Sequence, residues 1–226
     1  MKRHSLHLIA WIVLLAVSRH ASAELSPWIN EFHYDNTGTD NNEFVEVAVP
    51  LSITDLSTLR LTLYNGGDGK PYGTSHLLSS FTAGETHGSF TLYSKPLSGL
   101  QNGAPDGLSL DLQGAVVHFI GYEGGFVASS GPAAGLLAMD VGRAEGDLTP
   151  PGGSVGLVGT GGEGGGGDFL WESLSEATPG GANLGQFIVP EPRASVLVAV
   201  FGMAGWLWHR SRSRSRPSPC PHRGRP

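Results

Sequence analysis

The stretch Leu59-Arg60-Leu61-Thr62-Leu63-Tyr64 has the clearest β-strand pattern in this chain. Its leucines recur at every second position, which is the period of a β-strand whose side chains point alternately to two faces. The pattern predicts a strand that turns its leucines towards a core. Arg60, Thr62 and Tyr64 are expected on a solvated face.

Similar short runs continue on both sides of this stretch, separated by clusters of Gly, Pro, Asn and Asp. The other candidate strands are Trp28–Tyr34, Glu43–Val49, Ser89–Tyr93, Leu108–Leu112, Val116–Tyr122, Ser154–Val158 and Phe169–Glu172. Between residues 24 and 188 no stretch of a dozen residues has a helical period with caps. Many short strands with turn signals between them predict an all-β sandwich or barrel. The Gly-rich connections Gly124–Pro151 and Gly159–Gly167 are expected to be mobile loops that do not pack on their own.

Charge divides the chain into unlike parts. Residues 24 to 190 hold 19 acidic and 4 basic residues, a formal charge of −15, whereas the other ten basic residues lie in the two ends. A domain this acidic is not expected to bind nucleic acid, because binding to phosphates requires clustered Lys and Arg. The only cysteine is Cys220, which excludes a disulfide-stapled scaffold.

The first 23 residues have the organisation of a secretory signal peptide. Lys2 and Arg3 form a basic start, and an apolar run extends from Leu6 to Val17. Ala21 and Ala23 give the small-x-small pattern of a cleavage site. We expect an exported mature chain that begins at Glu24.

The C-terminus combines three further features. The motif Pro190-Glu191-Pro192 precedes an uncharged segment, residues 194–208, which is short for a membrane-spanning helix. The Arg-rich tail, residues 209–216, follows, and residues 217–226 are expected to be a disordered cytoplasmic extension. The arginines indicate that this end is cytoplasmic and lie at Arg210, Arg212, Arg214 and Arg216.

Residues 189–216 resemble the PEP-CTERM sorting signal of Gram-negative bacteria. The resemblance implies that an exosortase in the inner membrane recognises Pro190, Glu191 and Pro192 and removes the tail on the way to the cell surface or extracellular matrix. The alternative is a permanent membrane anchor. The chain departs from the family's usual pattern in its extra residues, 217–226.

The middle of the chain is similar to lamin-tail-like domains. The similarity begins with Trp28-Ile29-Asn30-Glu31-Phe32 and Glu43-Phe44-Val45-Glu46-Val47, and a later match is Thr178-Pro179-Gly180-Gly181-Ala182-Asn183-x-Gly185-Gln186. It implies an immunoglobulin-like β-sandwich over residues 24–188. Leu56-Ser57-Thr58-Leu59 stands where the family usually has Ser-Gly-Trp, so one core aromatic is missing.

An oxygen-rich turn between the first two candidate strands is a candidate metal site. Asp35, Asp40 and Glu43 are weak candidate ligands for Ca²⁺, which prefers six to eight oxygen ligands. The spacing is not that of an EF-hand. An ordinary turn, in which Asn and Asp side chains cap backbone groups, is the preferred interpretation, so no cofactor is expected unless Ca²⁺ binds.

The remaining chemical motifs point to structural roles. Gly152-Gly153-Ser154-Val155-Gly156 matches the G-x-S-x-G pattern, but no helix is expected after the serine, as a nucleophile elbow requires. His33 is expected at the surface, and His118 is expected to face solvent. Glu31, Glu43 and Glu46 are expected to lie close together, and the resemblance implies that they are framework positions rather than glycosidase carboxylates.

We therefore expect an exported, non-catalytic structural or adhesive module of the cell envelope or matrix. The export machinery and an exosortase are the expected partners, with matrix polysaccharide or a surface protein as the ligand. A metal-dependent extracellular hydrolase, nuclease-like by family association, is the alternative. The two differ in whether perturbed carboxylates and histidines gather in a cleft.

Overall fold

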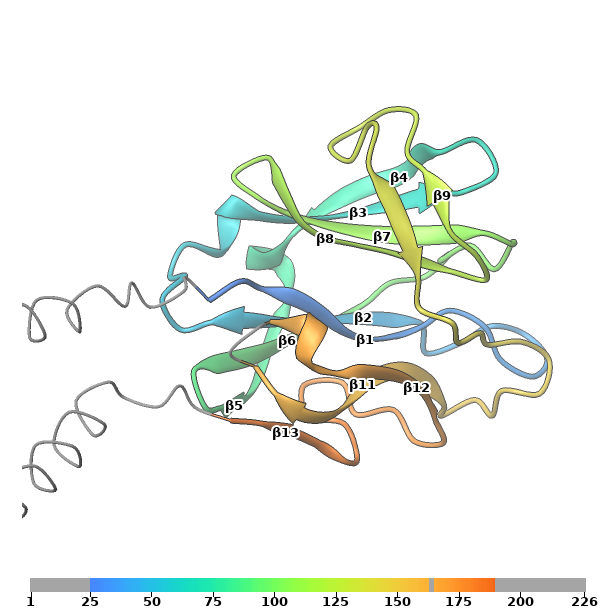
Figure 1. Cartoon of the computed structure of the whole chain (residues 1–226). Helices are drawn as coiled ribbons and strands as arrows, with labels where there is room; N and C mark the ends of the chain where they lie inside the picture. The colour runs from blue at the N-terminus through green and yellow to red at the C-terminus, as the bar shows by residue number, and fades with distance from the viewer. Residues whose placement is uncertain (1–24, 163–164, 190–226) are drawn as a thin grey trace, which may run out of the picture. The chain divides into compact units, whose positions relative to one another are not determined.

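Two β-sheets packed face to face make up the described part of the chain, as the computed structural model shows (Figure 1). The structure describes residues 25–162 and 165–189. The expected signal peptide, membrane segment and Arg-rich tail lie outside these residues. Within the described ranges, no helix is long and apolar enough to cross a membrane.

The first sheet has seven strands in the order β12-β11-β1-β2-β6-β5, and β13 pairs with β11. Neighbours along the main path are antiparallel, whereas β13 runs parallel to β11. The bounds are β1 (Trp28–His33), β2 (Phe44–Pro50), β5 (Thr82–His87), β6 (Phe90–Pro96), β11 (Ser154–Gly161), β12 (Leu170–Leu174) and β13 (Gln186–Ile188).

The second sheet has six strands in the order β4-β3-β7-β8-β10-β9. Three short 3₁₀ helices complete the described structure: η1 (Leu56–Thr58), η2 (Leu78–Ser80) and η3 (Gly166–Asp168). The strand bounds are β3 (Leu59–Asn65), β4 (Lys70–Leu77), β7 (Asp106–Leu112), β8 (Ala115–Tyr122), β9 (Phe126–Val127) and β10 (Leu137–Asp140).

The main core lies between the two sheets. Ile29, Val47 and Val155 from the first sheet pack in one cluster with Leu61 and Leu108 from the second. Both faces of β2 are buried, as the lack of clean alternation in its sequence predicts. Removing this apolar surface from water is worth roughly 25 cal/mol per Å², which makes the core the main source of stability.

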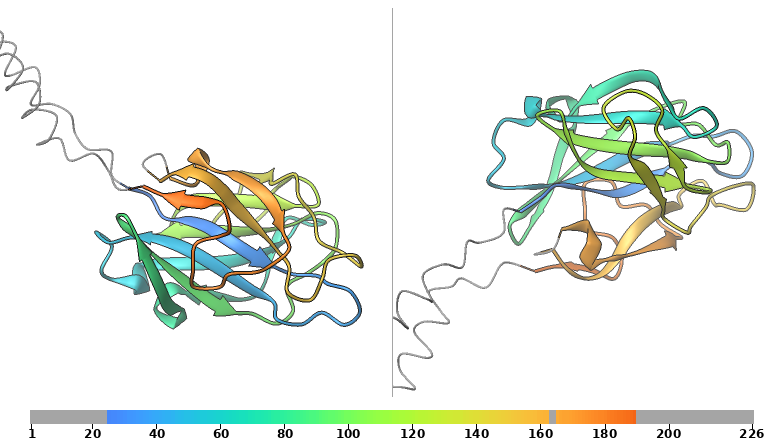
Figure 2. Two further views of the ribbon diagram at one scale, coloured as in Figure 1. Left: turned by 90° about the horizontal axis from the view of Figure 1, so that it is seen from below. Right: turned by 45° about the horizontal axis from the view of Figure 1, so that its top comes forward.

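The outer face of each sheet is covered as well. On the first sheet, Trp28, Leu92 and Leu157 form a second cluster with Phe169 and Ile188, which come from the C-terminal part of the domain. Figure 2 shows this C-terminal segment in orange across the seven-stranded sheet. Each sheet is therefore buried on two faces over much of its area.

A third cluster lies on the outer face of the second sheet and corrects one prediction. Thr62 and Tyr64 are not solvated but almost completely buried. Tyr64 is buried because residues 126–138 fold over it, whereas the Thr62 hydroxyl bonds Ser75 Oγ at 3.0 Å. Tyr64 Oη accepts a hydrogen bond from Ala133 N at 2.9 Å and donates one to Ser130 O at 3.1 Å. Only Arg60 of the three predicted solvent-facing residues is exposed.

The expected loop Gly124–Pro151 is thus largely a packed cover that contains β9 and β10. The prediction of a loop at Gly159–Gly167 is also wrong in its described part, since β11 continues to Gly161 and η3 follows. Gly166 lies so close to the Trp28 ring that a Cβ atom would come within 2.9 Å of its side chain. Glycine at this point allows the backbone to pack closely against Trp28 and does not indicate a mobile loop.

All eight candidate strands exist, within a few residues of the predicted bounds. The sequence pattern missed β4, β5, β9, β10 and β13. β4 contains Pro71 and Gly73 and lies at a sheet edge, where a missing N–H is tolerated. β5 has no large apolar residue.

Candidate functional site

The oxygen-rich turn does not gather the three candidate Ca²⁺ ligands. Asp35 and Asp40 lie close together. Burial is the main cause that raises the pKa of Asp35, and the neighbouring Asp40 carboxylate raises it further. Glu43 instead accepts a hydrogen bond from Gly99 N at 2.7 Å. Within residues 25–162 and 165–189, no group of three or more His, Cys, Asp or Glu side chains is placed to hold a metal ion. The turn is held by Asn36, whose side chain bonds three backbone groups between residues 37 and 41.

His33, expected at the surface, is buried in an ion pair with Glu145. The two side chains are each 1% exposed, and Nδ1 lies 2.7 Å from Glu145 Oε1. Nε2 faces Asn36 Oδ1 at 3.2 Å and Asn41 O at 3.1 Å. Both ring nitrogens therefore face oxygen acceptors, an arrangement that only the imidazolium satisfies fully. Burial alone would lower the pKa of His33, but the hydrogen bond and charge of Glu145 outweigh it and raise the pKa.

Glu145 also organises the chain around the end of β1. Its Oε2 accepts hydrogen bonds from Tyr34 N at 2.6 Å and Asp35 N at 3.2 Å. Its own backbone N donates to Tyr34 Oη at 2.7 Å, and that hydroxyl donates to Glu123 at 3.0 Å. Glu145 thus ties the segment after β10 to the end of β1. No local sequence pattern indicates this role, because 112 residues separate Glu145 from His33.

A second buried carboxylate, Glu31, joins three distant parts of the chain. Its Oε1 accepts from Ser154 Oγ at 2.5 Å and from Thr178 N at 3.0 Å, and its Oε2 accepts from Thr178 Oγ1 at 3.1 Å. Burial raises the pKa of Glu31 although these hydrogen bonds oppose the shift. Ser154 is therefore a structural donor at the start of β11, not a nucleophile on an elbow before a helix.

Glu46 lies close to Glu31 and binds the same C-terminal segment. It accepts hydrogen bonds from Asn30 Nδ2 at 2.9 Å and from Gly180 N. Burial raises its pKa to about 8, with a contribution from the Glu31 charge and against the pull of the two hydrogen bonds. The described residues place no Lys or Arg in an ion pair with either carboxylate.

Amide side chains complete this buried network. Asn30 Oδ1 accepts from Trp28 Nε1 at 3.0 Å and from Gln186 Nε2 at 2.6 Å. Asn183 Nδ2 donates to Leu157 O at 2.8 Å, and its Oδ1 accepts from Thr178 at 2.9 Å. The motifs around Glu31, Glu46 and Thr178–Gln186, on which the lamin-tail-like resemblance rests, therefore meet in one place.

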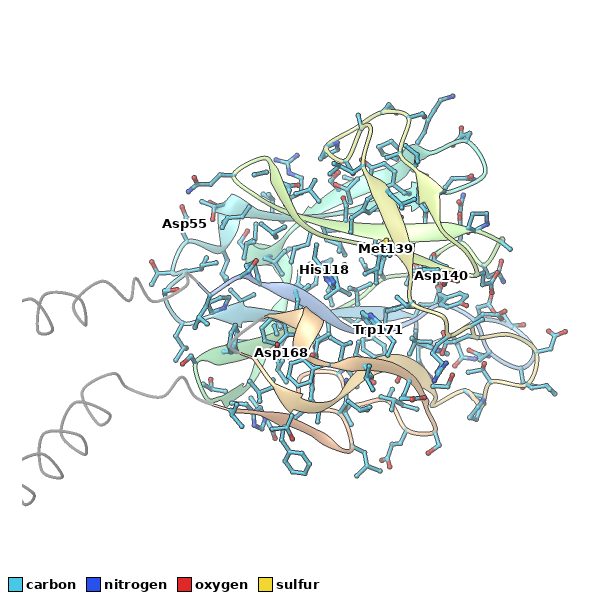
Figure 3. The ribbon with its side chains drawn as sticks, viewed as in Figure 1. Asp55, His118, Met139, Asp140, Asp168 and Trp171 are labelled. Carbon is cyan, nitrogen blue, oxygen red and sulfur yellow. The ribbon has the colours of Figure 1, made fainter. Side chains whose placement is uncertain are left out.

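His118 contradicts the expectation that it faces solvent. Its side chain lies between the sheets (Figure 3), and its Nδ1 accepts a hydrogen bond from Ile29 N at 3.0 Å. Ile29 lies next to an irregularity in the β1–β2 pairing. Its N–H donates to His118 of the opposite sheet. Burial lowers the pKa of His118 to about 4, and the acceptor role of Nδ1 requires the neutral ring.

Several open grooves lie on the surface. The first has a volume of about 590 Å³ and includes Glu145, Ser154 and Leu174 in its lining. Two of the polar side chains that line it are engaged elsewhere, Glu145 by His33 and Ser154 by Glu31. Asp147 and Thr149 line it as well. A second groove of about 440 Å³ lies at the β7–β8 turn and contains Arg60 and Asp111.

The remaining site residues predicted from the sequence lie outside the described residues. They are Ala21 and Ala23 of the cleavage site, Pro190, Glu191 and Pro192 of the sorting motif, and Arg210, Arg212, Arg214 and Arg216. The described chain stops one residue before the motif, at Val189, directly after β13.

Comparisons with protein-family models, curated proteins and solved structures found no match to this chain. Its function is therefore inferred from its own sequence and geometry.

Proposed function

We propose that this chain is an exported structural or adhesive protein of the cell surface or extracellular matrix, delivered by an exosortase-type C-terminal signal. The two resemblances supply this proposal: the sorting signal for its destination, and the lamin-tail-like motifs for an immunoglobulin-like arrangement of the sandwich. Export precedes cleavage at Ala23, and the exosortase acts at Pro190-Glu191-Pro192.

The observation that best supports a non-catalytic role is that buried acidic and basic side chains with shifted pKa values are hydrogen-bonded within the protein. Glu31, Glu46 and His33 each have their polar atoms engaged by the protein itself. His118 likewise bonds Ile29 across the core. A general acid or base needs an atom free to reach a substrate proton. These side chains instead hold segments of the fold together.

The C-terminal segment of the domain is held to the first sheet by hydrogen bonds close to the proposed sorting motif. Residues 178–186 are tied to β1 and β2 through Glu31, Glu46 and Asn30, and the proposed motif begins four residues after Gln186. These hydrogen bonds keep the domain folded as far as the residues just before the proposed cleavage signal. Removal of residues beyond the motif would leave each of these hydrogen bonds in place.

The sorting proposal is tested by substituting the motif in the native host. Glu191→Ala in the full chain is expected to leave the tail attached and to hold the protein in the membrane fraction. Glu176→Ala, a nearby exposed acidic residue, is the matched control and should be released like the natural chain. Equal release of Glu191→Ala would contradict recognition of the motif.

The hydrolase alternative is tested separately. The purified full chain is assayed on DNA, on simple esters and on polysaccharides, with and without divalent cations. We expect no turnover above the background of a Glu43→Gln variant. Robust turnover by the natural chain that is lost in Glu43→Gln would replace the adhesive role with an enzymatic one.

A further inference from the structure

Exposed apolar side chains gather near the C-terminal end of the described chain. Phe169 and Ile188 point into the second core cluster, and side chains alternate between two faces along extended chain. Their sequence neighbours Leu170 and Phe187 therefore face outwards, and they are 71% and 64% exposed. We call this surface the C-terminal apolar patch, and its members are Leu170, Leu184, Phe187 and Val189.

The patch lies beside the second half of β11. Leu170 of β12 pairs with Val158, and Phe187 of β13 pairs with Thr160. The two β11 positions are two residues apart, so both large side chains flank one short stretch of that strand. Val189 N also donates a hydrogen bond to β11. In Figure 1, β11, β12 and β13 lie together at the lower side of the domain, in shades of orange. The patch is therefore one surface, not a set of scattered exposed residues.

The charge around the patch restricts its partner. Residues 154–189 contain no Lys or Arg, and residues 177–189 contain no charged residue of either sign. An anionic partner thus finds no cation here, and a second copy of the domain would bring its own charge of −15. A zwitterionic lipid surface has no net charge and takes up apolar side chains, so it avoids both penalties.

The position of the patch in the chain favours a lipid surface as its partner. Val189 precedes the uncharged segment, residues 194–208, by five residues. Five residues of extended chain span at most about 18 Å. Once that segment crosses a membrane, the patch stays close to the lipid surface, and the tether gives a weak contact a high effective concentration. A second exposed apolar group, Val127 and Met139 of β9 and β10, belongs to the other sheet and is far from this segment in sequence.

We propose that the C-terminal apolar patch docks the domain on a zwitterionic bilayer for as long as the tail stays attached. The inference rests on the proposed function and deepens it, because it names the surface on which the sorting signal is read. With Val189 at the lipid surface, Pro190-Glu191-Pro192 begins where an enzyme embedded in the membrane can reach it. Removal of the tail removes the tether, and a single weak anchor gives only reversible binding, so the domain then leaves the membrane.

The test follows a fluorophore placed within the patch. The full chain is exported by a host without an exosortase, so that the tail stays attached, and is purified from the membrane fraction. Cys220→Ser removes the natural thiol, and Thr160→Cys carries an NBD label. In phosphatidylcholine vesicles, a lipid with a nitroxide on its headgroup quenches the label only at close range. We expect quenching to fall by about threefold or more when Leu170→Ser and Phe187→Ser are combined, because the tether alone then holds the domain near the lipid.

Val127→Ser combined with Met139→Ser is the matched control. These side chains are 58% and 64% exposed and lie on the other sheet, so their loss should leave quenching unchanged. Thermal unfolding checks that each double variant keeps the Tm of the labelled parent. Leu184→Ser, in the turn before β13, provides a second patch variant if the double variant unfolds, and it should also reduce quenching. Docking is overturned if the patch variants are quenched like the parent, or if patch and control variants lose quenching equally.

Flotation of the chain with the vesicles separates this inference from the proposed function. A chain that does not float lacks the expected membrane segment and overturns both. A chain that floats, but whose quenching does not depend on the patch, overturns the docking alone. Concentration-dependent dimers that form through the patch without quenching would replace the lipid surface with a second copy of the chain.

Discussion

His33 Nδ1 lies 2.7 Å from Glu145 Oε1, and both side chains are 1% exposed. The pair joins the end of β1 to the segment that follows β10. With acceptors at Nε2 as well, the imidazolium is fully hydrogen-bonded inside the protein. This contact is a buried electrostatic link between parts of the chain that are distant in sequence.

Glu145→Gln should therefore destabilise the protein strongly. It leaves a buried histidine without its counter-charge, and breaking a buried pair costs about 3–5 kcal/mol. Urea unfolding at pH 6 measures the loss. Glu172→Gln, which breaks the exposed pair with Arg143, is the control and should lower stability much less. Equal losses in the two variants would contradict the buried ion pair.

The same pair gives a pH dependence with a definite sign. The pKa of His33 is raised above its ordinary 6.5, so the folded state holds the proton more tightly than the unfolded state. Its stabilising contribution is full below pH 6.5 and is lost as the pH rises through the raised pKa. Chemical-shift titration of the His33 ring should give a midpoint above 6.5, and a midpoint below 6.5 would refute the imidazolium.

Glu46→Gln should flatten the dependence of stability on pH. Because burial raises the pKa of Glu46 from 4.5 to about 8, its contribution is full below pH 4.5 and is lost as the pH rises to 8. One proton changes the unfolding free energy by at most about 1.4 kcal/mol per pH unit. Urea unfolding at pH 5, 6, 7 and 8 compares the slopes. The prediction fails if the slope of Glu46→Gln matches that of the natural chain.

His118→Phe should show the opposite pH behaviour. The pKa of His118 is lowered to about 4, so its contribution is full above pH 6.5 and is lost as the pH falls from 6.5 to 4. At pH 7 the variant leaves Ile29 N–H without its acceptor, at a cost of about 1–3 kcal/mol. The difference from the natural chain should shrink towards pH 4. His87→Phe is the control, and an identical stability of His118→Phe and the natural chain at pH 7 would rule out the bond across the core.

Asn183→Ala should loosen the C-terminal segment without unfolding the sheets. The Asn183 side chain bonds Leu157, Thr178 and, at 3.4 Å, Asn30 O, so its loss removes three hydrogen bonds that hold residues 178–186 to the sheet. Hydrogen exchange at Thr178 and Gly180 should then become faster, while exchange in β3 and β7 stays slow. Asn102→Ala changes an exposed asparagine and serves as the control. Unchanged protection of Thr178 would show that the network does not hold the segment.

The strands could be predicted from the sequence better than their surroundings. Leu59, Leu61 and Leu63 mark β3 correctly, because period-2 alternation reports one buried face directly. The prediction for Tyr64 is wrong, since its burial depends on residues 126–138 folding back over the second sheet. Composition alone marks that cover as a loop, because its Ala and Gly residues have little apolar surface of their own.

The buried polar contacts were the least predictable part. The Glu145 partner of His33, the Ile29 partner of His118 and the Thr178 partner of Glu31 are separated from them by 112, 89 and 147 residues. No local pattern reports such pairings. The family resemblance implies framework roles for Glu31 and Glu46 and includes Thr178 in a later motif. In the structure, Glu31 bonds Thr178 and Glu46 bonds Gly180.

Export of the domain and its release from the tail form the core of the proposed function. Intact mass and C-terminal peptide mapping of the protein from its native host's exported fraction measure both events together. We expect a chain that begins at Glu24 and ends close to Pro190-Glu191-Pro192. A chain that keeps residues 194–226 would mean a permanent membrane anchor and would contradict sorting by an exosortase.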